Sequence, residues 1–458
     1  MKRQLLLALG FSMLFAGWLS AFLLTGAPQA STVYIIGPTL LLGVGMGVIH
    51  KTVGVKLTVL NLALTALIAL LLLNQISPGK GVSIPAIQKR MQKNTQSGHL
   101  ISLAVRDADR TGSFAEPHSL EAFAGIKVQL FATLPGSARM LSFDPAGKLY
   151  VSIPELGAIY QLTDINKDGF AEQPILYHVG MDRPHGLVWD HDKLYVAETS
   201  QILELRDTNH DNQVDESRVI LDGLPDDGGH WTRTLVQGKD GLLYLSVGSR
   251  CNACEETNPQ RASVLKVDPE TGKFSVFARG LRNSVGLAFA PDGTLWGSDN
   301  GRDMLGDELP PDEINQIIAN ADYGWPNCYG QQVPDHELGS SELCRNTLAS
   351  SVDLPAHSAP LGIAFGDHLQ APDEYKNSLY VAFHGSWNRS EPTGYKLIRI
   401  PYNNQQMSKN GKDFLRGWLV DGKVWGRPVA PVVGPDGNLY LSDDHAKAIY
   451  RISWTNQQ

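Results

Sequence analysis

Arginine and histidine residues recur at one position of a repeated sequence unit, just before a short hydrophobic run. The six residues are, in chain order, Arg139, His185, His230, Arg282, His357 and Arg427. Guanidinium groups carry a permanent positive charge, and imidazole groups donate or accept hydrogen bonds near neutral pH. A repeat that gathers these side chains therefore predicts a site for an anionic, oxygen-rich ligand. The alternative is that some of them only bind backbone carbonyl groups between neighbouring repeats.

The unit that must position these residues is a tight turn followed by a strand that carries an aromatic residue. It occurs as DPAGKLYVSI, DHDKLYVAET, GKDGLLYLSV, PDGTLWGSDN, KNSLYVAFHG and PDGNLYLSDD. Short strands that recur about every 40–50 residues are typical of β-propellers. We therefore predict an all-β fold, a six-bladed β-propeller, in which the equivalent residue of each blade points at one central channel.

The N-terminal part of the chain has a different composition. Of the 458 residues, three apolar runs at 5–25, 32–49 and 57–73 carry no charge. Each has roughly the 20 residues that span a bilayer, so we predict about three transmembrane α-helices before the propeller. The first run also fits a cleaved signal peptide, since Lys2 and Arg3 precede it. The expected domains are a membrane anchor (1–75), a linker that leads into the propeller (76–125) and the catalytic propeller (126–458).

Charge and cysteine content indicate where the propeller resides. The net charge is -8 without a cluster of lysine and arginine, which argues against nucleic acid as a partner. Three spans with the N-terminus inside would place the propeller in the periplasm, at a bacterial inner membrane. The cysteines are Cys251, Cys254, Cys328 and Cys344, and an even number in an exported domain indicates disulfides. Of the three possible pairings we favour the local one, 251 with 254 and 328 with 344, and a zinc site at the CxxC is the alternative.

Two acidic loops have the alternating oxygen ligands of calcium-binding loops. The oxygen-bearing residues are Asp164, Asn166, Asp168 and Glu172 in the first loop, and Asp207, Asn209, Asp211 and Asp215 in the second. This alternation turns carboxylate and amide oxygens inward around a hard cation, so we predict structural calcium. The alternative is a pair of hairpin tips built from Asx turns, because neither loop has the glutamate at position twelve of an EF-hand.

Three long motifs point to a known family. They are GGHWTRTLVQGKDGLLYLSVGS, ARGLRNSVGLAFAPDGTLWGSDNGRD and DEINQIIANADYGWPN, within residues 228–327. In this order they resemble the pyrroloquinoline quinone (PQQ) dependent sugar dehydrogenases, the soluble glucose and sorbosone dehydrogenase family. HGSWNRSEPTGYKLIRI and WGRPVAPVVGPDG are similar to the sorbosone branch. The resemblance covers about residues 126–458. It implies a six-bladed propeller that uses PQQ and calcium to oxidise a hydroxyl or aldehyde group of an aldose or sorbosone-like sugar.

The resemblance also implies roles for single residues. By motif position, His230 is the base that takes the hydroxyl proton, and Arg282 contacts the quinone and stabilises the charge that develops on it. Asn283 and Arg427 are further implied contacts of the cofactor.

The remaining implied contacts depart in part from the family pattern. Gly301 supplies a backbone carbonyl to the calcium of the cofactor, and Arg302 stands at the next ligand position, where the glucose enzyme has proline. A second basic position of the family is Val429 here. Arg389 or Lys396 is therefore expected to supply the missing charge.

Two other functions remain open for a propeller of this kind. A calcium-dependent hydrolase of the lactonase type would place carboxylates and asparagine around an axial metal, whereas this axis carries arginine and histidine. A non-catalytic periplasmic binding scaffold would not need a basic ring. As a dehydrogenase, the protein would have a small sugar, the membrane and an electron acceptor such as a cytochrome or quinone as its partners. The sequence has no haem-attachment CxxCH, so the electrons would pass to a separate carrier.

Overall fold

The computed structural model describes residues 98–123 and 125–455. The three apolar runs predicted to span a membrane, and much of the predicted linker, lie outside the described residues. Among the described helices, none is long and apolar enough to cross a membrane. The helices within the described ranges are short: α5 (Ser341–Cys344), α6 (Asp373–Lys376) and three 3-10 turns at Asp107–Asp109, Gly112–Phe114 and Pro154–Leu156.

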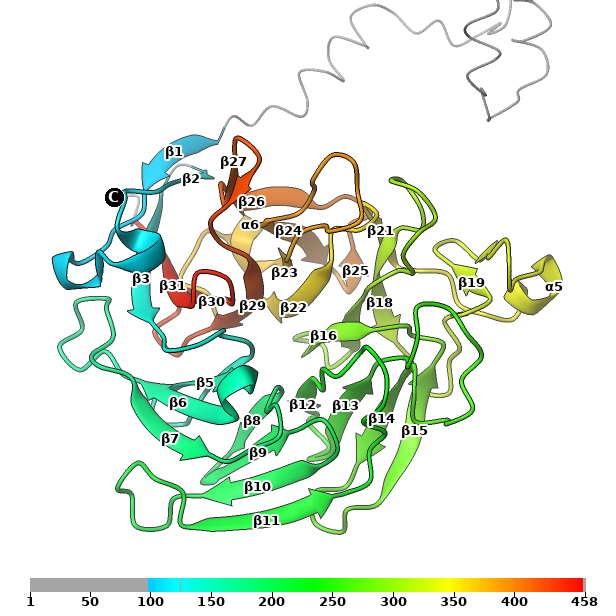
Figure 1. Ribbon diagram of the computed structural model, residues 1–458, viewed down its shortest axis with the longest axis horizontal. Coiled ribbons are helices and arrows are strands. Elements are labelled where there is room, and N and C mark those ends of the chain that lie inside the picture. The colour runs from blue at the N-terminus through cyan, green and yellow to red at the C-terminus, as the bar shows by residue number, and fades with distance from the viewer. Residues whose placement is uncertain (1–97, 124, 456–458) are drawn as a thin grey trace, which may run out of the picture. The chain divides into compact units, whose positions relative to one another are not determined.

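The described chain forms an all-β, propeller-like fold of antiparallel sheets set around an axis (Figure 1). Five blades are separate four-stranded sheets. They are β4 (Leu141–Phe143), β5 (Leu149–Ile153), β6 (Ala158–Leu162) and β7 (Ile175–Val179); β8 (Leu187–Asp190), β9 (Lys193–Ala197), β10 (Ile202–Arg206) and β11 (Glu216–Leu221); β12 (Leu235–Gln237), β13 (Leu243–Val247), β14 (Ser263–Val267) and β15 (Phe274–Arg279); β16 (Ser284–Phe289), β17 (Leu295–Asp299), β18 (Asp312–Ile317) and β21 (Val352–Leu354); and β29 (Pro428–Val433), β30 (Leu439–Asp443), β31 (Ala448–Trp454) and β3 (Ile126–Thr133).

A larger, seven-stranded sheet stands between the β16 and β29 blades. Its strands are β22 (Pro360–Phe365), β23 (Ser378–Phe383), β24 (Lys396–Asn403), β26 (Lys412–Arg416), β2 (Ser119–Ala122) and β1 (His99–Ser102), with β25 (Gln406–Met407) paired to β24. The innermost strands β4, β8, β12, β16, β22 and β29 contact one another in this order, and β29 contacts β4 again. Two small hairpins, β19 (Cys328–Tyr329) with β20 (Val333–Pro334) and β27 (Leu419–Val420) with β28 (Lys423–Val424), lie outside the blades.

The sequence repeat corresponds to the second strand of each blade, counted from the axis. Its six aromatic residues are all buried: Tyr150, Tyr195, Tyr244, Trp296, Tyr380 and Tyr440. In three blades the turn before the strand is tied to the aromatic, because the hydroxyls of Tyr150, Tyr244 and Tyr440 donate to a turn aspartate at 3.4, 3.0 and 3.0 Å. The aromatic thus fills the space between blades while its polar end holds the turn.

The blade that contains β29 is built from both ends of the described chain. Strand β3 pairs with β31 along its whole length, from Ile126 opposite Trp454 to Thr133 opposite Ala448. This pairing joins the first strand of the predicted propeller to its last strand and closes the ring, which leaves no open edge between the first and last blades.

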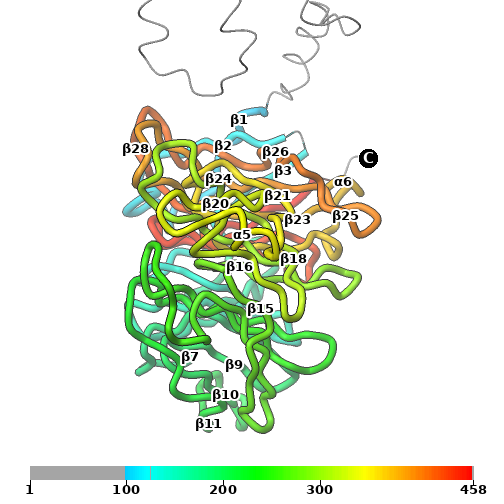
Figure 2. Tube along the Cα trace, turned by 90° about the vertical axis from the view of Figure 1, so that its right-hand side faces the viewer, coloured from blue at the N-terminus to red at the C-terminus, as the bar shows by residue number. Residues whose placement is uncertain are grey.

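The described residues before 126 add two strands to a sheet of the propeller, where the sequence predicted a linker. Strand β2 pairs with β26, and β1 pairs with β2, so both strands belong to the seven-stranded sheet. Figure 2 shows β1 and β2 beside β26, in agreement with Figure 1. Phe114 and Leu120 are buried in one hydrophobic cluster with Phe414 and Trp418. Both strands accordingly belong to the same compact unit as the blades.

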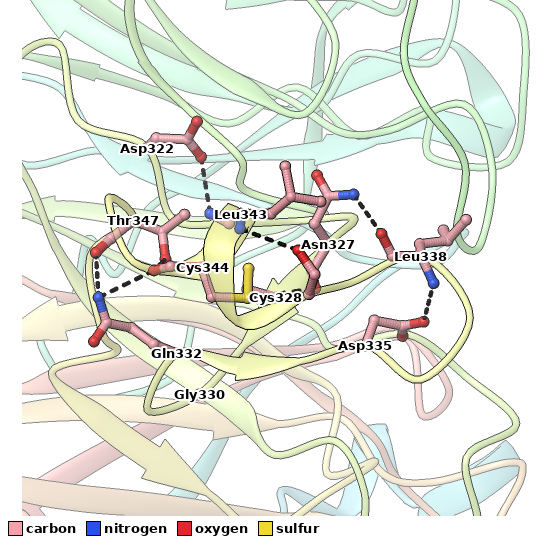
Figure 3. The surroundings of a disulfide bond; sticks show 12 residues. Asp322, Asn327, Cys328, Gly330, Gln332, Asp335, Leu338, Leu343, Cys344 and Thr347 are labelled. Carbon is pink, nitrogen blue, oxygen red and sulfur yellow. Dashed lines mark hydrogen bonds between the residues drawn. A yellow bond between two sulfur atoms is a disulfide. The ribbon is translucent and has the colours of Figure 1, made fainter.

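Both predicted disulfides are confirmed. Cys251 is bonded to Cys254 and Cys328 to Cys344, so the sulfur atoms of the CxxC are not available to zinc. The second disulfide closes an insertion between β18 and β21 that carries β19, β20 and α5 (Figure 3).

The packing of the N-terminal strands predicts a difference between two leucines. We expect Leu120→Ala to lower the free energy of unfolding by about 2–5 kcal/mol, because it leaves a cavity in a core cluster. Leu100→Ala, in the neighbouring strand, is the matched control, since Leu100 is 78% exposed. Urea unfolding of both variants measures the difference. Equal, small losses would contradict the assignment of residues 98–122 to the propeller core.

Candidate active site at one end of the ring

Each blade brings two chain segments to the same end of the ring, the start of its inner strand and the end of its second strand. Antiparallel pairing places them opposite each other, as Ser284 pairs with Asp299 and Pro428 with Asp443. The arginines and histidines predicted from the repeat belong to the first segment. The second segment contributes residues that the repeat did not reveal, above all His384 after β23 and Asp444 after β30.

Buried carboxylates fix two of the arginines in place. The carboxylate of Asp299 accepts the backbone N–H of Arg282 at 3.0 Å, and that of Asp443 accepts the backbone N–H of Arg427 at 2.9 Å. Burial raises the pKa of Asp299 and of Asp443 to about 6 in each case. The same device therefore sets the start of the inner strand in both blades.

His230 is half-buried, and Ser249 fixes its ring. Nδ1 lies 2.8 Å from the carbonyl oxygen of Ser249 and 3.0 Å from its Oγ. Because a carbonyl only accepts, Nδ1 carries the hydrogen and Nε2 carries the lone pair. Burial, followed by the positive charge of Arg282, lowers the pKa of His230 to about 4. At neutral pH the imidazole is a neutral acceptor, and no residue in the described part of the chain is bonded to Nε2.

Arg282 is buried and held by several partners. Its Nε donates to the carbonyl of Asn252 at 2.9 Å, Nη1 to the carbonyl of Asn300 at 3.2 Å, and Nη2 to Asp303 at 3.2 Å. The next residue, Asn283, lies against His230. A Cβ atom on Gly248 would meet His230 Cβ at 2.6 Å and Asn283 Oδ1 at 2.7 Å, so only glycine allows this approach. The structure thus brings His230, Arg282 and Asn283 together.

The other two histidines of the repeat also bind backbone carbonyl groups. Nδ1 of His185 lies 3.2 Å from the carbonyl oxygen of Arg233, and Nε2 of His357 lies 2.7 Å from that of Gly306. These two side chains therefore fit the alternative given for the repeat, in which a residue only binds backbone carbonyl groups between blades. His185 also contacts the Trp231 ring edge-on, with the ring centroids 5.6 Å apart.

The guanidinium of Arg427 is bonded to carbonyl groups. Nε donates to His384 at 3.1 Å and Nη2 to Gly385 at 2.9 Å, and the group lies 5.7 Å from the centre of the Tyr395 ring. No carboxylate in the described ranges contacts this guanidinium, so its charge is not neutralised by a direct partner. Val429, where the resemblance implies a second basic residue, is fully buried with Met140, Val285 and Leu361.

The two residues expected to replace that charge lie in different places. Arg389 donates to the carbonyl of Asp307 and pairs with Glu308, in the loop that follows Gly301. Lys396 is on the third strand of its blade, where Nζ donates to Asp413 at 2.6 Å. No described contact brings Lys396 to the other predicted site residues.

Gly301 and Arg302 present two successive carbonyl groups. No donor among the described residues reaches either oxygen. The carboxylate of Asp312 accepts the N–H of Gly301 at 2.9 Å and fixes this loop. The guanidinium of Arg302 is turned away, into ion pairs with Asp335 at 2.8 Å and Glu337 at 2.9 Å. Both carboxylates come from the insertion closed by the second disulfide, which thereby neutralises the charge of Arg302.

The two acidic loops have the same geometry. The side chain of Asp164 accepts the N–H groups of Asp168 and Gly169, and that of Asp207 accepts the N–H groups of Asp211 and Asn212. Both loops connect outer strands, β6 to β7 and β10 to β11, and are separate from the ring of arginines and histidines. Calcium in these loops stays a prediction.

These features define a propeller with a cationic, histidine-bearing site at one end of its axis. Residues 120–455 match the family model described as TrAA12-like, and the chain belongs to this family. The predicted relationship to the PQQ-dependent sugar dehydrogenases is thereby confirmed.

Two individual relatives and one solved structure show how far the similarity extends. An uncharacterized protein of Borreliella burgdorferi is 32% identical over 347 residues, which cover 72% of this chain and 89% of the relative. The PQQ-dependent pyranose dehydrogenase of Coprinopsis cinerea is 27% identical over 294 residues, or 49% of this chain and 39% of that enzyme. The chain thus spans about two fifths of that enzyme's length. The holo form of the PQQ domain of this dehydrogenase has the same fold, with a TM-score of 0.63, 22% identity, and coverage of 73% of this chain and 97% of that chain.

The environment of His230 predicts its titration. We expect the imidazole signal of His230 in NMR spectra to titrate with a pKa of about 4. Arg282→Gln should raise this pKa, because a nearby positive charge is removed, but burial should keep it below the ordinary value of about 6.5. Arg416→Gln, which changes an arginine paired with Glu121 on an outer strand, is the control and should leave the pKa unchanged. A wild-type pKa near 6.5 would show that the ring is not buried as described.

Proposed function

We propose that this protein oxidises a hydroxyl or aldehyde group of a sugar, an aldose or a sorbosone-like compound, with PQQ as its cofactor. The observation that carries the proposal is the neutral imidazole of His230, whose lone pair on Nε2 is unbonded beside Asn283 and the charge of Arg282. The name of the pyranose dehydrogenase relative supports the cofactor and the substrate class.

The donors at the ring fit a planar, anionic quinone. The charge of Arg427 has no direct carboxylate partner, and the two side-chain groups of Arg282 and Asn283 lie next to the base. We propose that Arg282, Asn283 and Arg427 hold the cofactor, with Arg389 as a further donor from the neighbouring loop. When bound, PQQ supplies the acceptor for the hydride that leaves the sugar carbon.

The loop at Gly301 fits a hard cation. Two successive carbonyl oxygens without a donor are ligands that calcium prefers, and the Arg302 guanidinium does not oppose a cation there. We propose that Gly301 and Arg302 bind the calcium that accompanies the cofactor through their carbonyl groups.

His230 then acts as the base. Nε2 takes the proton of the sugar hydroxyl while the hydrogen on Nδ1 stays bonded to Ser249. That bond keeps the ring from turning, so the lone pair stays directed at one point. Val429 packs with Met140, Val285, Leu361 and Ala430 in a buried apolar cluster to which four blades contribute, and apolar packing of this kind excludes water.

The setting of the enzyme extends the proposal. We propose a complete six-bladed propeller whose sixth blade is the inner part of the seven-stranded sheet. Residues 1–75 would anchor it, with the propeller at the periplasmic face of a bacterial inner membrane and the electrons passed to a cytochrome or quinone. The two disulfides support an oxidising compartment.

Substitution of the base and of the cofactor contact tests the function. His230→Gln should bind PQQ and calcium like the wild type but lower kcat roughly 10²–10⁴-fold, the usual effect of removing a positioned base. Arg282→Gln should weaken cofactor binding as well as turnover. His191→Gln, at an exposed hairpin tip, is the matched histidine control and should retain full activity. The measurements are PQQ binding by absorbance and sugar oxidation with an artificial dye.

Two outcomes would contradict the proposal. A wild-type protein that does not bind PQQ would argue for a hydrolase or a binding scaffold instead. Undiminished activity of His230→Gln would remove the catalytic role from this residue.

A further inference from the structure

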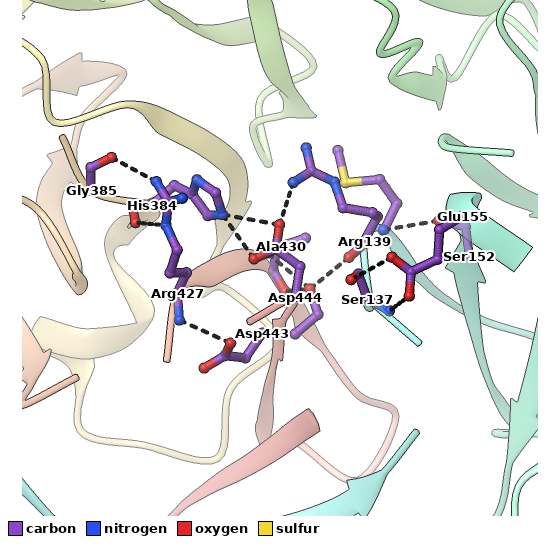
Figure 4. Close-up of polar contacts among 12 residues, drawn as sticks. Ser137, Arg139, Ser152, Glu155, His384, Gly385, Arg427, Ala430, Asp443 and Asp444 are labelled. Atoms are coloured by element: carbon purple, nitrogen blue, oxygen red, sulfur yellow. Dashed lines mark hydrogen bonds and ion pairs between the residues drawn. The ribbon is translucent and has the colours of Figure 1, made fainter. Parts of the chain in front are cut away.

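A second histidine at the same end of the ring is held by a carboxylate. His384 follows β23, and its Nε2 lies 2.9 and 3.0 Å from the two carboxylate oxygens of Asp444. Asp444 follows β30 and also accepts Arg139 Nη1 at 2.8 Å. Figure 4 shows this row of three side chains, with Arg427 next to His384.

The contacts define which ring nitrogen of His384 carries the hydrogen. Burial alone would raise the pKa of Asp444, but its bonds and charge interactions with His384 and Arg139 hold that pKa well below the usual range. An ionised carboxylate only accepts, so Nε2 of His384 donates and Nδ1 carries the lone pair. No partner for Nδ1 occurs in the described part of the chain, and Nδ1 is not among its buried, unbonded polar atoms.

The charges around His384 favour its neutral form. Burial lowers the pKa of His384 to about 4, and the positive charges of Arg427 and Arg139 act in the same direction against the attraction of Asp444. A neutral ring with a free lone pair accepts a hydrogen bond from a hydroxyl group but repels a carboxylate. The guanidinium of Arg427, which is bonded to the carbonyl of His384, is the group that attracts an anion here.

We propose that Nδ1 of His384 accepts a hydrogen bond from a second hydroxyl group of the bound sugar, and that His384 is therefore a specificity-determining residue of the site. This inference rests on the proposed sugar oxidation. The unbonded nitrogen of His185, Nε2, is buried away from a ligand, whereas the unbonded Nδ1 of His384 is not buried. His230 receives the proton of the hydroxyl that is oxidised, and His384 orients the sugar by another hydroxyl. Asp444 and Arg139 are positioning residues: Asp444 binds Nε2 of His384 and leaves Nδ1 free as the acceptor, and Arg139 holds Asp444.

Two substitutions separate this role from a structural one. His384→Gln places an amide near Nε2, which preserves a donor to Asp444 and removes the acceptor at Nδ1. His384→Asn places an amide oxygen near Nδ1, which preserves the acceptor and gives up the bond to Asp444. With PQQ and calcium bound, His384→Gln should raise the KM for an aldose such as glucose about tenfold with kcat within about twofold, as for a lost hydrogen bond. His384→Asn should stay closer to the wild-type KM. If Gln has the wild-type KM and only Asn is impaired, the role is structural and the inference is overturned.

A series of monodeoxy sugars identifies the hydroxyl. The sugar that lacks the hydroxyl bound by His384 should have the same KM with the wild type and with His384→Gln, because the lost interaction is already absent. An equal increase of KM for every deoxy sugar would overturn the inference.

A measurement without turnover keeps this test apart from the proposed function. In ¹⁵N NMR spectra of the histidine-labelled protein, His384 should have a hydrogen on Nε2 and none on Nδ1, and added glucose should shift the Nδ1 signal. A hydrogen on Nδ1, or no shift at saturating sugar, would overturn the inference even if the protein oxidises sugars. Failure of the wild type to bind PQQ would instead contradict the proposed function, and the sugar-induced shift would still decide the role of His384.

Discussion

The closure of the ring by the pairing of β3 with β31 is the constraint on which the site depends. Arg139 lies a few residues after β3, and Asp444 lies just before β31, so the two are far apart in sequence. Strand pairing from Ile126 to Thr133 brings them to 2.8 Å. His384 from the neighbouring blade joins the same carboxylate. Without closure, Asp444 would lose the guanidinium of Arg139 and keep only the imidazole of His384 as a side-chain partner, which is unfavourable for a buried carboxylate.

Buried carboxylates position the functional groups in this molecule and do not themselves face the ligand. Asp299 and Asp443 bind the backbone of Arg282 and Arg427, Asp312 binds the backbone of Gly301, and Asp444 orients His384. Each of these oxygens has a donor, which offsets the free energy of burying the group. As a result, the arginine and histidine side chains are already held in place before a ligand binds. Stabilisation of a charge that develops during a reaction requires such preorganised groups.

Much of this arrangement was predictable from the sequence, and the remainder depended on contacts between distant residues. The repeat predicted the blades and the ring of arginines and histidines because strand, turn and aromatic recur with fixed spacing. The disulfides followed from local spacing. His384 and Asp444 were missed because the residue four places after each aromatic changes in type from blade to blade, with Asn300 in the β16 blade, so no common chemistry was visible. Val429, by contrast, was recognised as a departure, but its burial in an apolar cluster is set by three other blades.

The participation of both chain ends in one blade has a consequence for biosynthesis. A nascent chain can form its first blades as they leave the ribosome, but Arg139 meets Asp444 only after Trp454 has been added and has paired with Ile126. The row formed by His384, Asp444 and Arg139 is therefore complete only after strand β31 has paired. If the protein crosses a membrane during synthesis, the ion pair between Arg139 and Asp444 forms only after strand β31 has been translocated.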